Sequence, residues 1–300
     1  MQRYTKTGFA PQAAAAARGM AAAAALGLAL AGAALADPVE DTLVISTDDG
    51  DLTLTTTAPA PDHLKDVMDT IWSGWHYRED ETRDLERDDF DNPGMVFVDR
   101  GADSWNKAQG AKGESCAGCH QGPETMAGLR ATLPRVDANS GKLMLMEDYI
   151  NACVTERMGL EAWGWTGDKM KDMLALISMQ SRGMAVNVAI DGPAAAFWEK
   201  GKEIYYTRFG QLEMSCANCH EDNQGRMIRA DHLSQGQING FPTYRLKDAG
   251  ILSAQQRFIG CVRDTRAETF KAGSDEFKAL ELYVASRGNG LSVEGVSVRH

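Results

Sequence analysis

Ser115-Cys-Ala-Gly-Cys-His120 returns 100 residues later as Ser215-Cys-Ala-Asn-Cys-His220. In each copy two thiols stand one helical turn apart, and a histidine follows the second thiol. This spacing lets both thiols add to the vinyl groups of one porphyrin, while the imidazole turns under the ring as an iron ligand. The motifs therefore predict two covalently attached c-type haems. The attachment residues are Cys116, Cys119, Cys216 and Cys219, and the iron ligands are His120 and His220.

Two other chemistries use paired cysteines. A redox Cys-x-x-Cys pair does not require the following histidine and is not expected twice in a duplicated unit. A structural zinc site needs four donors grouped together. Each motif supplies two sulfurs and one imidazole, in a run too tight for tetrahedral closure around one ion, so haem c is the favoured interpretation.

The duplication extends beyond the haem motifs. Cys153-Val154 recurs as Cys261-Val262, and Ser181-Arg-Gly183 recurs as Ser286-Arg-Gly288. Matches in the same order and at a nearly constant offset indicate two copies of one unit of roughly 85–100 residues. The link between the copies is expected near residues 185–192.

The periodicity beyond residue 103 is helical. Six segments are bounded by Gly, Pro, Asp or Ser and predict helices at 105–113, 143–158, 168–182, 193–211, 253–269 and 274–286. Upstream, residues 37–60 alternate apolar and polar side chains and predict a short edge strand or extended arm, residues 63–87 predict an amphipathic helix, and residues 96–98 form a brief separate segment.

These patterns predict an all-α fold of two tandem c-type cytochrome domains, with an N-terminal extension that contains a helix and short strands. The expected boundaries are 37–100 for the extension, 101–188 for the first cytochrome domain and 189–300 for the second, catalytic one.

Residues 1–36 resemble a secretory signal peptide. Arg3, Lys6 and Arg18 precede an apolar run, and Ala34-Leu35-Ala36 supplies a small-x-small cleavage site. A membrane anchor is the alternative, but a span needs about 20 apolar residues and this run is shorter. The sequence therefore predicts export, with no membrane span in the mature chain.

The composition is 43% hydrophobic and 24% charged, which is ordinary for a globular protein and excludes disordered and low-complexity classes. The formal net charge is −11, and loss of the three cations in residues 1–36 makes it −14. An acidic chain without clustered Lys and Arg is unsuited to nucleic acid, because phosphate contacts need such clusters.

Each haem iron needs a sixth ligand or an open position. In the second copy the last methionine is Met227, seven residues after His220 and too close to reach the far face of the ring. His232 and His300 are further candidates. Cys261, on a predicted helix, is the favoured ligand because it otherwise has no use.

Cys153 matches Cys261 in the repeat and is the favoured ligand in the first copy. Thiolate ligation then accounts for all six cysteines. A disulfide between Cys153 and Cys261 is an alternative that an oxidising compartment allows. The first copy also offers competing methionines, namely Met144, Met146 and Met158.

The copies differ one helical turn before this cysteine. Arg257 stands four residues before Cys261, whereas Tyr149 stands four residues before Cys153. On a helix these positions share a face, so Arg257 would stabilise a thiolate and offer a two-pronged donor to an oxyanion. A surface arginine paired with a carboxylate is the alternative.

At these residues the chain resembles the SoxA family, the dihaem c-type subunits of the SoxAX complex of sulfur-oxidising bacteria. The resemblance covers nearly the whole chain after residue 36. Besides both haem motifs, it rests on Gly74-Trp-His-Tyr-Arg78, Asp88-Asp-Phe-Asp-Asn-Pro-Gly-Met95, Asn239-Gly-Phe-Pro-Thr-Tyr-Arg245, and Arg257-Phe-Ile-Gly-Cys-Val-Arg263 with Arg266-Ala-Glu268.

The resemblance implies an L-cysteine S-thiosulfotransferase of the periplasm. Such an enzyme joins thiosulfate to a cysteine of the SoxYZ carrier protein, passes two electrons to a downstream c-type cytochrome, and has a SoxX-type monohaem cytochrome as partner subunit. The resemblance also implies that Cys261 is the catalytic group, carried as a persulfide, and that Arg257 contacts the substrate. His120 and Cys153 would hold a first haem that lies too far away for rapid electron transfer.

Thiosulfate is a dianion, so an acidic chain needs a local cationic pocket to bind it. Arg257 is expected to form this pocket with Arg226, Arg229 or Lys247. A dihaem electron-transfer cytochrome without catalysis is the second hypothesis. A peroxidase is the third and is disfavoured, because its active haem should keep an exchangeable position.

Overall fold

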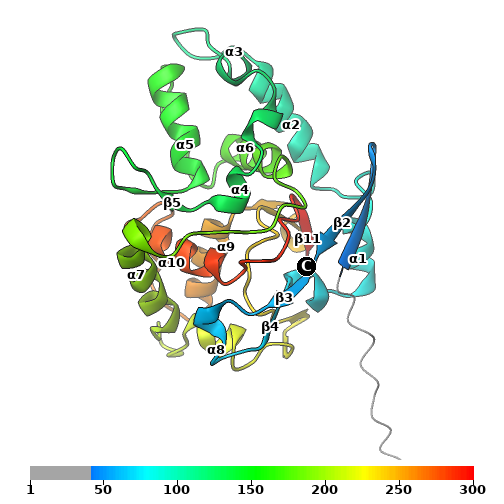
Figure 1. Ribbon diagram of the computed structural model, residues 1–300, viewed down its shortest axis with the longest axis vertical. Helices are drawn as coiled ribbons and strands as arrows, with labels where there is room; N and C mark the ends of the chain where they lie inside the picture. Colours follow the sequence, from blue (N-terminus) through cyan, green and yellow to red (C-terminus); the bar gives the residue numbers. More distant parts are fainter. Residues whose placement is uncertain (1–41) are drawn as a thin grey trace, which may run out of the picture. The chain divides into compact units, whose positions relative to one another are not determined.

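In the computed structural model, which describes residues 42–300, two helix pairs cross at a glycine in the same way (Figure 1). α2 (Met95–Asn106) crosses α6 (Asp168–Met179) at Gly101, and α7 (Ala195–Tyr206) crosses α10 (Asp275–Ser286) at Gly201. A Cβ atom at Gly101 would overlap the carbonyl oxygen of Asp172, and one at Gly201 would overlap that of Ala279. The two backbones therefore touch directly at each crossing. The duplication seen in the sequence is thus also present in the structure, as the same helix–helix contact in both copies.

The turns that lead into the two haem motifs are equivalent as well. Gly110 and Gly210 have left-handed backbones with φ of 73° and 65°, and each lies in a turn closed by an isolated β-bridge, Gln109 to Glu114 and Phe209 to Met214. Each turn delivers the chain into a one-turn helix, α3 (Cys116–His120) or α8 (Cys216–His220). In Figure 1, α3 lies near the top of the view and α8 near the bottom.

The all-α prediction is wrong, because the described residues also contain five small sheets. One is mixed, in the order β10-β9-β11, with β11 parallel to β9, and the other four are antiparallel pairs. The strands span two to six residues, which is too short for alternation to stand out in the sequence. The strands are β1 (Thr42–Thr47), β2 (Gly50–Thr55), β3 (Thr57–Pro59), β4 (Thr70–Trp72), β5 (Arg135–Val136), β6 (Leu143–Met144), β7 (Met227–Ile228), β8 (Asp231–His232), β9 (Thr243–Arg245), β10 (Gly250–Leu252) and β11 (Ser297–Arg299).

The amphipathic helix predicted at 63–87 is also wrong. The segment contains 3₁₀ turns at Asp62–Leu64 and Gly74–Tyr77, the strand β4, and a single short helix, α1 (Asp80–Glu86). Ser73 explains the break, because its hydroxyl accepts from the backbone N–H of Trp75 and donates to the buried carboxylate of Glu294. The hydrogen bond from Ser73 to Glu294 therefore outweighs the helical periodicity of this segment. The expected arm at 37–60 is, from Thr42 on, the β1–β2 hairpin and β3.

Four predicted helices are confirmed with shorter bounds, as α6, α7, α9 (Ala254–Asp264) and α10. Residues 96–98 belong to α2, which ends at Asn106, so the helix predicted at 105–113 is misplaced. The helix predicted at 143–158 is divided into β6, α5 (Met146–Ala152) and a π-helical turn at Cys153–Arg157. The remaining helix is α4 (Leu129–Thr132).

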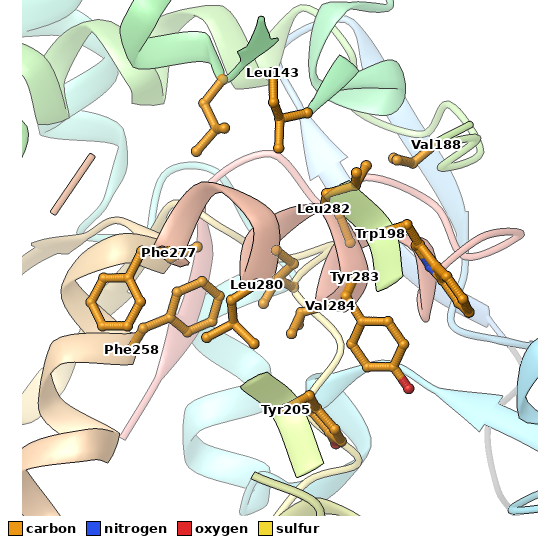
Figure 2. Close-up of a cluster of buried hydrophobic side chains, with 14 of the residues drawn as sticks. Leu143, Val188, Trp198, Tyr205, Phe258, Phe277, Leu280, Leu282, Tyr283 and Val284 are labelled. Carbon is orange, nitrogen blue, oxygen red and sulfur yellow. The ribbon is translucent and has the colours of Figure 1, made fainter. Parts of the chain in front are cut away.

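The core of the second copy is aromatic (Figure 2). Trp198 and Tyr205 of α7 face Tyr283 of α10, with ring centroids 5.4 and 5.1 Å apart. Phe258 of α9 packs on Phe277 of α10 at 5.8 Å. The helix that carries Cys261 is therefore fixed to the same crossing that carries the haem motif.

The copies meet through a buried cation. Arg130 of α4 donates to the carbonyl oxygens of Ile238 (2.6 Å) and Phe241 (2.8 Å) in the second copy. The described residues, 42–300, belong to one compact unit. The predicted signal peptide and cleavage site lie outside the described residues. Between residues 42 and 300 we find no helix with the length and apolar character needed to cross a bilayer.

Candidate functional site

α8 is short, and its first residues explain why it forms. The hydroxyl of Ser215 accepts from the backbone N–H of Asn218 (3.3 Å), and the Asn218 side chain accepts from the backbone N–H of Ser215 (3.0 Å). This reciprocal capping box satisfies donors that a one-turn helix leaves open. It places Cys216, Cys219 and His220 together on this short helix. In α3 only half of this arrangement exists, since Gly118 has no side chain to return the bond to Ser115.

His220 has one ring nitrogen committed to the backbone. Its Nδ1 lies 2.8 Å from the carbonyl oxygen of Ser234, and a carbonyl only accepts, so Nδ1 carries the proton. Burial lowers the pKa of His220 to about 4, which keeps the imidazole neutral. Nε2 therefore has a free lone pair, which is the state that binds iron.

Gly236 also lies against this imidazole. Its backbone is left-handed (φ 84°), and a Cβ atom there would lie 2.9 Å from Cγ of His220 and 3.1 Å from Nδ1. The ring is therefore held against bare backbone at Gly236 and against the Ser234 carbonyl.

We expect Gly236→Ala to disturb the second haem, with Gly225→Ala as the matched control. Gly225 has a similar φ of 74° but nothing within 4 Å of its would-be Cβ. Each alanine should cost about 1–2 kcal/mol of stability through its left-handed backbone. Only Gly236→Ala should also move the imidazole and alter the low-spin ferric resonance signal of the second haem. Identical spectra of the two variants would contradict a role for Gly236 in seating His220.

The structure brings each candidate ligand cysteine to its own haem motif. Burial and then the charge of Cys261 raise the pKa of Cys216 to about 12, and the same two causes raise that of Cys219. In the first copy, burial and then Cys153 raise the pKa of Cys116. All six cysteines lie in the described part of the chain as free thiols, and no disulfide joins Cys153 to Cys261.

These clusters fit covalent haem. Each offers two thiols one turn apart, an imidazole beside them, and a third thiol on a separate helical segment. A neutral, backbone-oriented histidine whose Nε2 has no hydrogen-bond partner among the described residues is the observation that fits the second site best.

The competing ligands from the sequence differ in their surroundings. Met146 and Met158 are buried in the hydrophobic core of the first copy, against which Cys116 also packs, while Met227 is exposed on β7. Nδ1 of His232 lies 3.4 Å from the carboxylate of Glu79.

Arg257 lies on α9 one turn before Cys261 and is half-buried. No carboxylate within residues 42–300 forms an ion pair with it, so the surface-pair alternative is not what the structure shows. Its charge opposes the rise in the pKa of Cys219. The guanidinium is thus beside the second thiol cluster with its donors available to an anion.

Sequence reasoning missed Arg78, a cation whose charge interacts with that of Arg257. Arg78 donates to Asp231 and to the carbonyl oxygen of His232 (2.7 Å), which ties the N-terminal segment to the β7–β8 hairpin. Burial, and then the charges of Arg299, Arg257 and Arg245, lower its pKa to about 10. The sequence did contain a signal for these cations, since Arg78 and Arg245 are the last residues of two of the runs on which the family resemblance rests. Arg226, Arg229 and Lys247 are exposed, and none of the described contacts joins them to Arg257.

The first site is built differently. Tyr149, the counterpart of Arg257, accepts a hydrogen bond from Nε of Arg135 (3.3 Å), and Cys119 is exposed. The ring of Trp105 lies 5.9 Å from that of His120. Thus one cluster has an unpaired cation beside its third cysteine, and the other has a hydrogen-bonded phenol.

Comparison with known proteins identifies the family. The SoxA/TsdA cytochrome c domain matches residues 100–186 and again residues 200–293. The chain is 75% identical over 300 residues, the full length of both proteins, to the L-cysteine S-thiosulfotransferase subunit SoxA of Paracoccus pantotrophus. It is 55% identical to the SoxA subunit of Rhodovulum sulfidophilum, over 90% of this chain and 93% of that one. A crystal structure of SoxXA from P. pantotrophus superposes with a TM-score of 0.86 at 78% identity, covering 88% of this chain and 100% of the matched one.

Proposed function

The chain belongs to the SoxA family of c-type cytochromes, and on that premise we propose that it is the catalytic subunit of an L-cysteine S-thiosulfotransferase. The reaction joins the outer sulfur of thiosulfate to a cysteine of the SoxYZ carrier protein. The carrier thiol loses one proton, and the two sulfurs that become bonded lose two electrons, which pass to a c-type cytochrome. The partner subunit is a SoxX-type monohaem cytochrome, and the compartment is the periplasm.

The observation that carries this proposal is the broken symmetry of the two sites. Both copies place a third cysteine at the haem motif, but only the second places an unpaired arginine one turn before it. Arg257 holds the sulfonate end of thiosulfate by two parallel N–H donors. Cys261, carrying an extra sulfur as a persulfide, receives the outer sulfur and hands the thiosulfonate to the carrier thiol by sulfur exchange.

The cofactors are two haems c, bound through Cys116 and Cys119 and through Cys216 and Cys219. Their irons are ligated by His120 with Cys153 and by His220 with Cys261. When bound, the second haem supplies a one-electron acceptor next to the reacting sulfur. The residues themselves orient the imidazole, hold the anion and keep the thiol cluster partly shielded from water. An intact mass of the mature chain should equal the polypeptide from Asp37 on plus two haems and one sulfur atom on Cys261, and one haem would remove one motif from the proposal.

The activity is tested by thiosulfate-dependent reduction of a c-type cytochrome in the presence of the carrier. We expect reduction to require the carrier cysteine, and the carrier mass to rise by one thiosulfonate group. A carrier with that cysteine replaced by serine is the control. Reduction by thiosulfate at the same rate without the carrier cysteine would instead identify an electron-transfer cytochrome.

A further inference from the structure

Arg287 is a cation enclosed by the second copy. It follows Ser286, the last residue of α10, and its side chain is 0% exposed. Nη1 donates to the carboxylate of Glu221 (2.6 Å), and the guanidinium lies over the ring of Tyr205 at 4.5 Å. Nε and Nη2 have no hydrogen-bond partner among the described residues. A charge in such surroundings is poorly screened, so its field extends into the protein around it.

Glu221 ties this cation to the haem motif. It is the residue directly after His220, and its backbone N–H closes α8 on the carbonyl oxygen of Ala217 (2.8 Å). The hydroxyl of Tyr206 also donates to its carboxylate (3.0 Å). The pair of opposite charges is therefore fixed one residue from the imidazole that is to bind iron.

The field of Arg287 reaches the site. The guanidinium lies over the rings of Tyr205 and Tyr283, with its carbon 4.5 and 5.8 Å from their centroids. Cys216 packs against the core cluster that contains both rings. The cation is therefore close to the haem motif through Cys216 as well as through Glu221.

The first copy lacks this arrangement. Arg182 occupies the equivalent place in the repeat, but both of its terminal nitrogens bind Asp89, at 2.8 and 2.6 Å. Asp89 belongs to the N-terminal segment and is not adjacent to His120 in the chain. Arg182 is thus neutralised by a two-pronged pair away from its haem motif, which makes it a natural control.

We propose that the Arg287–Glu221 pair sets the reduction potential of the second haem, with Arg287 raising it and Glu221 lowering it. Reduction adds one negative charge at the iron, so a buried cation nearby favours the reduced state and a buried anion opposes it. A thiolate ligand stabilises ferric iron, and Arg287 offsets part of that effect so that electrons from sulfur can enter the haem. The inference rests on the proposed haem at Cys216 and Cys219 and not on the transfer reaction.

The experiment is a redox titration of the haem-loaded chain, monitored by the low-spin ferric resonance signal of the second haem. That signal is identified as the one that changes when Cys261, the proposed ligand of the second haem, is replaced in a Cys261→Met variant. Arg287→Gln should shift the midpoint potential of the second haem down, and Glu221→Gln should shift it up. Arg287→Lys keeps the charge and should leave the potential close to that of the unmodified protein. Arg182→Gln should leave the second potential unchanged.

Opposite signs separate charge tuning from a structural role, because loosening the site would move both glutamine variants in the same direction. Shifts of equal sign, an Arg287→Lys shift as large as that of Arg287→Gln, or an equal shift in Arg182→Gln would overturn the proposal. If Arg287→Gln does not fold, the Glu221→Gln variant decides, since the absence of an upward shift refutes it. A chain without haem at Cys216 and Cys219 would overturn the haem assignment and this inference with it, whereas opposed shifts without transferase activity would overturn only the proposed function.

Discussion

Cys261→Met is expected to abolish thiosulfate transfer while two haems remain attached. A thioether binds ferric iron without a negative charge and cannot carry an exchangeable sulfur, so turnover should fall by about a thousandfold or more. The potential of the second haem should rise, because a neutral ligand stabilises ferric iron less than a thiolate does. Turnover, a denatured haemochrome count and the low-spin resonance signal measure the three effects.

Cys153→Met is the matched control. It occupies the equivalent position in the first copy, and the structure places it beside Cys116 rather than Cys261. It should change only the signal of the first haem and leave turnover nearly intact. If Cys261→Met leaves the spectra unchanged, Cys261 is not an iron ligand.

Arg257→Ala should leave both haems bound with nearly unchanged absorbance, while turnover falls steeply. A lost charge-assisted contact costs about 1.5–3 kcal/mol, and each ~1.4 kcal/mol is tenfold in rate, so the loss should be between roughly 10-fold and 150-fold. The reason is that Arg257 has no carboxylate partner within residues 42–300 and is available to the substrate anion. Steady-state rates over a range of thiosulfate concentrations make the measurement.

Two further variants sharpen this result. Arg257→Lys should recover only part of the rate, because a point charge does not reproduce the two parallel donors. Tyr149→Phe removes the phenol that accepts from Arg135 in the first copy and should affect stability more than rate. If Arg257→Ala turns over thiosulfate as fast as the unmodified chain, the active site is misplaced.

The haem motifs were predictable because the information is local: two thiols and an imidazole within one turn. Cys153 and Cys261 were predictable as a pair only because the duplication aligned them. The predicted helix at 63–87 failed because Ser73 bonds to Glu294, a partner more than 200 residues away that no periodicity reveals. The sheets were missed for a related reason, since β9 and β11 pair across more than 50 residues.

The surroundings of the site show the same limit. Ser234 and Gly236 seat His220, yet neither residue type signals such a role in the sequence. A loop carbonyl becomes a ligand-orienting group only after the chain has turned back on itself. Arg78 reaches the second copy from the N-terminal segment, and only the fold shows that it meets Asp231.

The glycine crossings determine how far the two halves of this chain are free to diverge. At Gly101 and Gly201 any larger residue would push one helix off the backbone of its partner, and the haem motif attached to that helix would move with it. Other equivalent positions in the two halves carry different residues, as Trp105 and Tyr205 illustrate. The common origin of the two halves is therefore easier to recognise from the backbone contacts at these glycines than from residue identities.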